Sequence, residues 1–133
     1  MASDPFEFLE REKVVELPLW RESLAGADWA KLQFSGVFYG FRVEHGRGDP
    51  VVTVPGFLGH DAYLFDFNFW LRRMGYKVFS SRIGLNSECP DLSLDRLLVT
   101  IHRAYNERGP VDLVGHSLGG MLARAAAVQE PRY

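Results

Sequence analysis

One serine, Ser117, lies in a pattern that is typical of nucleophilic catalysis. It is the centre of Gly115-His116-Ser117-Leu118-Gly119. In such a pattern a sharp strand-to-helix turn exposes the serine hydroxyl, and the glycines remove side chains that would collide there. The N–H of Leu118 then lies at the start of a helix, where it can donate to a developing oxyanion. We therefore predict Ser117 as the nucleophile and Leu118 as one oxyanion donor.

A second loop could complete the oxyanion hole. Pro55-Gly56-Phe57-Leu58-Gly59 follows a short β-branched run at 51–54. A glycine-containing loop after such a strand can present the N–H of Phe57 as the other donor. An ordinary strand-to-helix connection also favours Gly and Pro, so that alternative stays open for the loop alone. We assign Gly56, Leu58 and His116 to the substrate site, and the apolar Phe57-Leu58 pair indicates an acyl group.

The elements around these loops predict the fold. Strand composition occurs at 37–44, 51–54, 76–80 and 111–114, and helical patterns at 61–74, 93–108 and 118–129. Asp61 is the expected cap of the first of these helices, with Gly75 as its stop, and Ser93 begins the second. Strands that alternate with helices predict a mostly parallel sheet in a three-layer α/β/α domain over 35–133.

Residues 1–34 carry no motif of this kind and are expected to form a helical arm. Asp4-Pro5 fits a helix start, and Pro18 ends or kinks that helix. A second helical stretch runs from about residue 19 to 32.

The two loops together resemble the lipase/esterase branch of the α/β-hydrolase family. The similarity covers about residues 51–131 and is carried by Val-Pro-Gly-Phe-Leu-Gly at 54–59 and Val-Gly-His-Ser-Leu-Gly-Gly at 114–120. The resemblance implies that Ser117 attacks an ester carbonyl and forms an acyl-enzyme. It also implies that the N–H groups of Phe57 and Leu118 form the oxyanion hole.

The family's acid and histidine follow the serine in the chain. Here Glu130 follows Ser117, but no histidine does. We therefore expect a truncated α/β-hydrolase fold with little activity alone, because loss of triad members costs orders of magnitude in rate. Alternatives are a non-catalytic remnant or interaction module, and an acyltransferase or thioesterase that uses the same nucleophile.

The four histidines offer little as a replacement base. His60 is close in sequence to the oxyanion loop and is a weak candidate, whereas the His116 side chain is expected to point away from the position of a base. His102 is interpreted as a boundary residue of a helix, and His45 as a solvated turn residue.

A truncated fold of this kind is expected to leave apolar surface open. The strand at 111–114 would have one open side, so self-association through this edge is possible. In the helix at 61–74, one face is predicted to pack on the sheet and the other carries Phe65 and Phe69; the sheet-facing residues are Tyr63, Phe67, Trp70, Leu71 and Met74.

Composition excludes several other functions. A net charge of −2 gives no reason to expect nucleic acid. No apolar run reaches transmembrane length and the acidic N-terminus does not fit a secretory signal, so a cytoplasmic location is expected.

The lone Cys89 is interpreted as a free thiol. The sequence shows no cluster of metal ligands and no phosphate-binding loop, so we predict no metal and no cofactor, and a small-molecule acyl ester as the partner.

Overall fold

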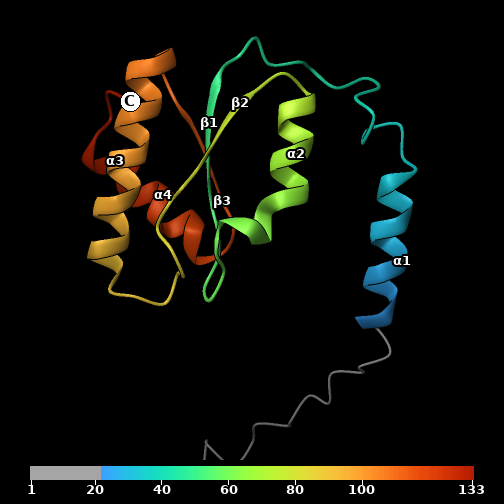
Figure 1. Ribbon diagram of the computed structural model, residues 1–133, viewed down its shortest axis with the longest axis horizontal. Helices are drawn as coiled ribbons and strands as arrows, with labels where there is room; N and C mark the ends of the chain where they lie inside the picture. The colour runs from blue at the N-terminus through green and yellow to red at the C-terminus, as the bar shows by residue number, and fades with distance from the viewer. Residues whose placement is uncertain (1–21) are drawn as a thin grey trace, which may run out of the picture. The chain divides into compact units, whose positions relative to one another are not determined.

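The computed structural model describes residues 22–133 (Figure 1). The chain divides into two units, residues 1–35 and 36–133. The described part of the first unit holds helix α1, Glu22–Gln33, which matches the second helix expected in the arm. The helix predicted to begin at Asp4-Pro5 lies outside the described residues.

The second unit is built on a three-stranded parallel sheet. Its strands are β1 (Pro50–Val54), β2 (Lys77–Ser80) and β3 (Asp112–Gly115), in the order β2-β1-β3. Every residue of the central strand β1 is buried. A continuous β-branched run suits a strand that is covered on both faces. Three of the four predicted strands are therefore confirmed.

The fourth prediction, a strand at 37–44, is wrong, because residues 37–42 form consecutive turns and residues 43–44 are irregular. Gly40 and Arg42 have φ angles of 83° and 59°, whereas a strand needs strongly negative φ. The N–H of Phe41 donates to the Gly36 carbonyl at 2.9 Å, which closes the segment on itself. Its aromatic residues pack on α2 instead: the Arg73 guanidinium lies 5.1 Å from the centre of the Tyr39 ring.

Helices cover both faces of the sheet (Figure 1). Helix α2, Phe65–Arg73, contributes Leu71 to a small cluster with Val51 on one face. Helices α3 (Pro90–Arg108) and α4 (Leu118–Gln129) pack on the other face against Val52 and Val54. Successive residues of a strand point to opposite faces, so β1 serves both layers. The prediction of a three-layer α/β/α domain is confirmed.

Two helix starts differ from the prediction. A 3-10 helix, Asp61–Leu64, precedes α2, and its cap is His60, whose Nδ1 accepts from the Ala62 N–H at 3.2 Å. The Asp61 carboxylate instead binds the end of β2 by accepting from the Ser81 hydroxyl at 2.7 Å. Helix α3 begins at Pro90 rather than Ser93. Proline suits the first helical position, because a backbone N–H there would have no acceptor within the helix.

The predicted sheet-facing surface of the helix at 61–74 is only partly correct. Leu71 and Met74 are buried as expected, but Tyr63 is 65% exposed and Phe67 is also exposed. Tyr63 lies in the 3-10 turn, whose three residues per turn do not continue the α-helical face. Phe67 stacks on Trp70 instead, with ring centres 6.2 Å apart.

Strand β3 lies at the edge of the sheet. It pairs with β1 alone, so its second edge has no strand partner among residues 22–133. Val114 on this edge is 39% exposed. The open edge that the sequence predicts is therefore present in the described part of the chain.

The α-helices of the described residues are between 9 and 19 residues long. Within residues 22–133 no helix combines the length and the apolar character that a bilayer crossing requires.

Replacing Leu97 with Ala tests the larger core. Leu97 is 0% exposed on α3, so Leu97→Ala should lower the free energy of unfolding by about 2–5 kcal/mol, because a cavity replaces packed methyl groups. The matched control Val99→Ala lies on the same helix but is 72% exposed, and should change it by less than about 1 kcal/mol. Urea unfolding measures both, and equal losses would contradict this packing.

Candidate active site

The predicted loops meet at the carboxyl ends of the strands. The oxyanion loop (residues 55–59) follows β1, and the nucleophile turn (residues 115–119) begins at the last residue of β3. The register pairs Val54 with Gly115, and the His116 N–H donates to the Val54 carbonyl at 3.0 Å. In open parallel sheets ligands bind at this end of the strands.

Ser117 has the backbone of a strained turn. Its φ and ψ are 51° and −121°, its side chain is exposed, and α4 begins at the next residue. A residue with a side chain adopts this conformation at a cost of about 1–3 kcal/mol, and such strain concentrates at functional sites. The strand, turn and helix that the nucleophile pattern requires are therefore all present around Ser117.

The two glycines of the turn allow backbone to pass against backbone. A Cβ on Gly119 would collide with the carbonyl oxygens of Val54 and Pro55, and one on Gly115 would collide with the backbone of Gly119. Helix α4 can therefore start directly above the ends of β1 and β3 only because both positions lack side chains.

Gly56 brings the oxyanion loop against the nucleophile turn. A Cβ at this position would lie 2.7 Å from His116 Nδ1 and 3.3 Å from Ser117 Cβ. The loop itself is a tight turn in which the Gly59 N–H donates to the Gly56 carbonyl at 2.9 Å. Leu58 takes a left-handed φ of 57° in this turn, which side chains rarely adopt.

Both predicted oxyanion donors are available. Neither the Phe57 N–H nor the Leu118 N–H donates a hydrogen bond to any residue within 22–133. Leu118 is the first residue of α4, where an N–H has no acceptor within the helix. Two unpaired backbone donors on adjoining loops beside an exposed serine are the groups that could stabilise an oxyanion.

A pocket of about 200 Å³ lies beside these loops. The predicted substrate residues Gly56, Leu58 and His116 all line it, together with Phe57, Gly59 and Tyr63. Ser117 and Leu118 are not among its lining residues. Sequence reasoning missed Tyr63, whose ring centre lies 5.6 Å from that of His116. Its aromatic spacing pointed to the sheet, and nothing local in the sequence indicates the 3-10 turn that redirects it.

The histidines are engaged elsewhere or exposed. No hydrogen bond joins the Ser117 hydroxyl to a histidine within residues 22–133. His60 caps the 3-10 helix, and His102 Nδ1 lies 2.6 Å from the Tyr133 hydroxyl. His45 is exposed, as its turn position predicts.

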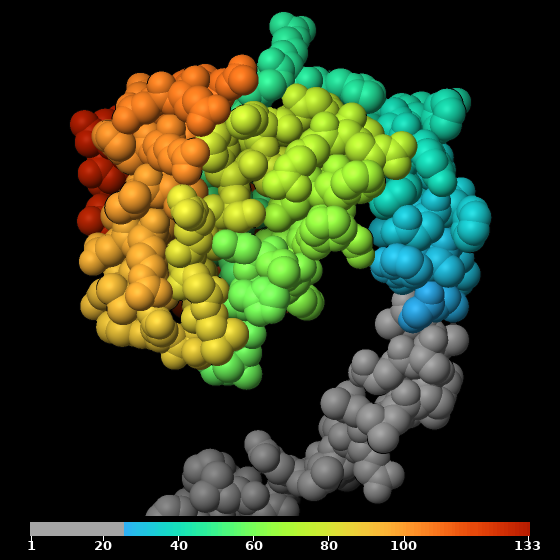
Figure 2. Space-filling model, viewed as in Figure 1, coloured from blue at the N-terminus to red at the C-terminus, as the bar shows by residue number. Residues whose placement is uncertain are grey.

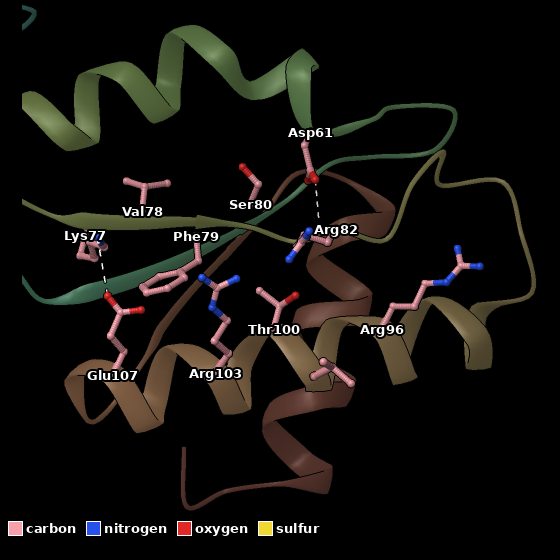
Figure 3. A pocket seen from close by; sticks show the side chains of 11 residues that line it. Asp61, Lys77, Val78, Phe79, Ser80, Arg82, Arg96, Thr100, Arg103 and Glu107 are labelled. Atoms are coloured by element: carbon pink, nitrogen blue, oxygen red, sulfur yellow. Dashed lines mark hydrogen bonds and ion pairs between the residues drawn. The ribbon is translucent and has the colours of Figure 1, made fainter.

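A larger groove of about 850 Å³ lies between β2 and α3 (Figure 3), and Ser117 is not among the residues that line it. The segment from β2 to α3 forms the yellow surface between α2 and α3 in Figure 2. Four cations line the groove: Lys77, Arg82, Arg96 and Arg103. Two of them are ion-paired, Arg96 with Glu88 at 2.7 Å and Lys77 with Glu107 at 3.7 Å. The groove contains none of the predicted site residues.

Adding a methyl group to the nucleophile turn tests its geometry. Gly119→Ala should lower the free energy of unfolding by about 3 kcal/mol or more, because its Cβ would overlap two carbonyl oxygens that cannot move freely. Gly120→Ala is the matched control. A Cβ there has its closest contact at 3.4 Å, so the change should lie within about 1 kcal/mol of the parent. Thermal or urea unfolding gives both values, and a Gly119→Ala protein as stable as Gly120→Ala would refute the close approach.

Comparison with known proteins adds a family to this geometry. The family model described as lipase (class 2) matches residues 59–130, which is more than half of the chain and includes Ser117. Searches of curated proteins and of solved structures each found no match. The matched family supports an ester hydrolase of the lipase or esterase type. The chain belongs to the class 2 lipase family.

Proposed function

We propose that the chain is a serine hydrolase of the α/β-hydrolase fold that acts on carboxylic esters through an acyl-enzyme on Ser117. One observation carries the proposal: Ser117 is exposed in a strained turn, with φ of 51°, between β3 and α4. Gly56 of the oxyanion loop adjoins this turn. In this proposal the N–H groups of Phe57 and Leu118 receive the oxyanion.

The chemistry begins with attack of Ser117 Oγ on the carbonyl carbon of the ester. A new C–O bond forms, the carbonyl electron pair moves to the oxygen, and the hydroxyl proton passes to a base. Collapse of the tetrahedral intermediate breaks the bond to the alcohol, which takes up a proton as it leaves. Water then repeats the sequence on the acyl-enzyme and releases the acid. Both tetrahedral oxyanions would accept hydrogen bonds from Phe57 and Leu118.

The base is the limiting component. Since no described histidine hydrogen-bonds Ser117, its hydroxyl is expected to react slowly by itself. Oxyanion stabilisation and binding alone retain only a small part of triad catalysis, roughly 10³–10⁴-fold over water.

The pocket favours a small apolar acyl group. Phe57, Leu58 and Tyr63 expose apolar surface beside Gly56, and the pocket of about 200 Å³ is small for a long chain. A thioesterase or acyltransferase would use the same serine and differ in the leaving group or acceptor. The lack of a histidine bond to Ser117 favours a second candidate, a non-catalytic binding or interaction module.

A fluorophosphonate probe distinguishes these candidates. Incubated with added imidazole as an external base, the chain should become labelled at Ser117, and the rate should rise with imidazole concentration because the neutral ring accepts the serine proton. Mass spectrometry of the intact chain and of its peptides measures extent and site.

Two variants control the labelling. Ser117→Ala should abolish it, whereas Ser87→Ala, at another exposed serine, should leave the rate unchanged. Labelling that persists in Ser117→Ala, or a parent chain that imidazole does not activate, would eliminate the hydrolase proposal. A short p-nitrophenyl ester tested in parallel reports whether the acyl group is also released.

The open edge of β3 suggests a second copy of the chain as a partner. A parallel strand with unpaired N–H and C=O groups is a template for pairing. Sedimentation velocity should show association that increases with protein concentration, and Val114→Lys on this edge should weaken it. Val128→Lys on the exposed side of α4 is the control and should have no effect. A parent chain that stays monomeric at all concentrations would contradict this expectation.

A further inference from the structure

We infer that Asn86 is a positioning residue that holds the oxyanion loop in the shape that presents the Phe57 N–H. This inference rests on the proposed function, because the loop is assigned there to oxyanion binding. Asn86 belongs to neither the nucleophile turn nor the oxyanion loop. It lies in the segment that joins β2 to α3, so a segment that follows β2 also contributes to the site.

Asn86 makes three hydrogen bonds to the oxyanion loop. Its side-chain Nδ2 donates to the Pro55 carbonyl at 2.8 Å. Its backbone carbonyl accepts from the Leu58 N–H at 2.9 Å, and its backbone N–H donates to the Gly59 carbonyl at 2.9 Å. One residue therefore uses a side chain and both backbone groups on the same five-residue loop.

The three hydrogen bonds from Asn86 hold residues on both sides of Phe57. They fix Pro55, which lies before it, and Leu58 and Gly59, which follow it. The Phe57 N–H has no acceptor within residues 22–133. An arrangement that holds the neighbours while leaving one donor unpaired is what a preorganised oxyanion hole requires, since such donors act without reorganising during the reaction.

The loop needs this support because its conformation is unfavourable by itself. Leu58 holds a left-handed φ of 57° with a branched side chain that is mostly exposed and packs little. Strained residues persist only where surrounding contacts determine them. The hydrogen bond from the Leu58 N–H to Asn86 is a contact that fixes this residue directly.

Burial makes the side-chain bond strong and specific. Asn86 is 2% exposed, and its Nδ2 bond to Pro55 is buried. A buried donor without a partner would be costly, and the Pro55 carbonyl supplies the acceptor that the Asn86 amide needs. Removing the side chain takes this donor away from the Pro55 carbonyl and loosens the part of the loop that precedes Phe57.

Saturation kinetics of fluorophosphonate labelling with imidazole test this role. Asn86→Ala should lower the maximal inactivation rate about 10- to 100-fold, because a misplaced donor stabilises less of the developing charge, and should leave the half-saturating probe concentration nearly unchanged. The control is Thr100→Val, which also removes a buried side-chain bond to backbone, from Thr100 Oγ1 to the Ser81 carbonyl at 2.9 Å. It should lower the melting temperature but not the inactivation rate.

Amide hydrogen exchange followed by NMR supplies a second measurement on the parent chain, which does not depend on whether Asn86→Ala folds. The Leu58 amide should exchange slowly, and the Phe57 amide quickly. A Leu58 amide that exchanges as fast as Phe57 overturns the inference, as does an equal loss of rate in Asn86→Ala and Thr100→Val. If the parent chain is not labelled at all, the hydrolase proposal fails, whereas slow exchange at Leu58 beside fast exchange at Phe57 in the parent chain still supports the positioning role.

Discussion

The contact on which the site depends is the approach of α4 to the end of β1, which leaves no room for a side chain at position 119. The Gly119 backbone lies directly against the carbonyls of Val54 and Pro55. This contact fixes where α4 begins, and thereby fixes the turn that carries Ser117. Gly56 makes a similar approach from the other loop, so two glycines, one on each loop, bring residues 55–59 against the turn that carries Ser117.

The parts of this arrangement that sequence reasoning predicts are those encoded by neighbouring residues. The buried strand at 51–54, the nucleophile turn and the helix after it are each specified by a local pattern of β-branched, glycine and helix-forming residues. The segment at 37–44 shows that residue composition alone can predict a strand where the chain forms turns. Its aromatic and β-branched residues suit a strand, but Gly40 and Arg42 adopt positive φ and turn the chain toward α2, where Trp70 Nε1 donates to the Val37 carbonyl at 3.1 Å.

The parts that the sequence does not reveal depend on contacts between distant residues. Tyr63 reaches His116 across the pocket, and Asn86 bonds to Pro55, which lies 31 positions earlier in the chain. Neither residue has an unusual local pattern. Asp61 is similar: its residue type suits a helix cap, but its carboxylate accepts from the Ser81 hydroxyl and the Arg82 N–H, which directly follow β2. In each case tertiary contacts, rather than local propensity, decide the role of a polar side chain.

The parallel order of the sheet also has a consequence for how the chain folds. Strand β1 must pair with β3 although α2, β2 and α3 lie between them in the chain, and this pairing sets the register of Val54 against Gly115. Such non-local contacts form late, because closing long loops costs chain entropy before any contact compensates for it. The left-handed backbone at Ser117 has no support until that pairing exists. The strained backbone of Ser117 is therefore a property of the fully assembled sheet, and partially folded chains would carry Ser117 as an ordinary, relaxed serine.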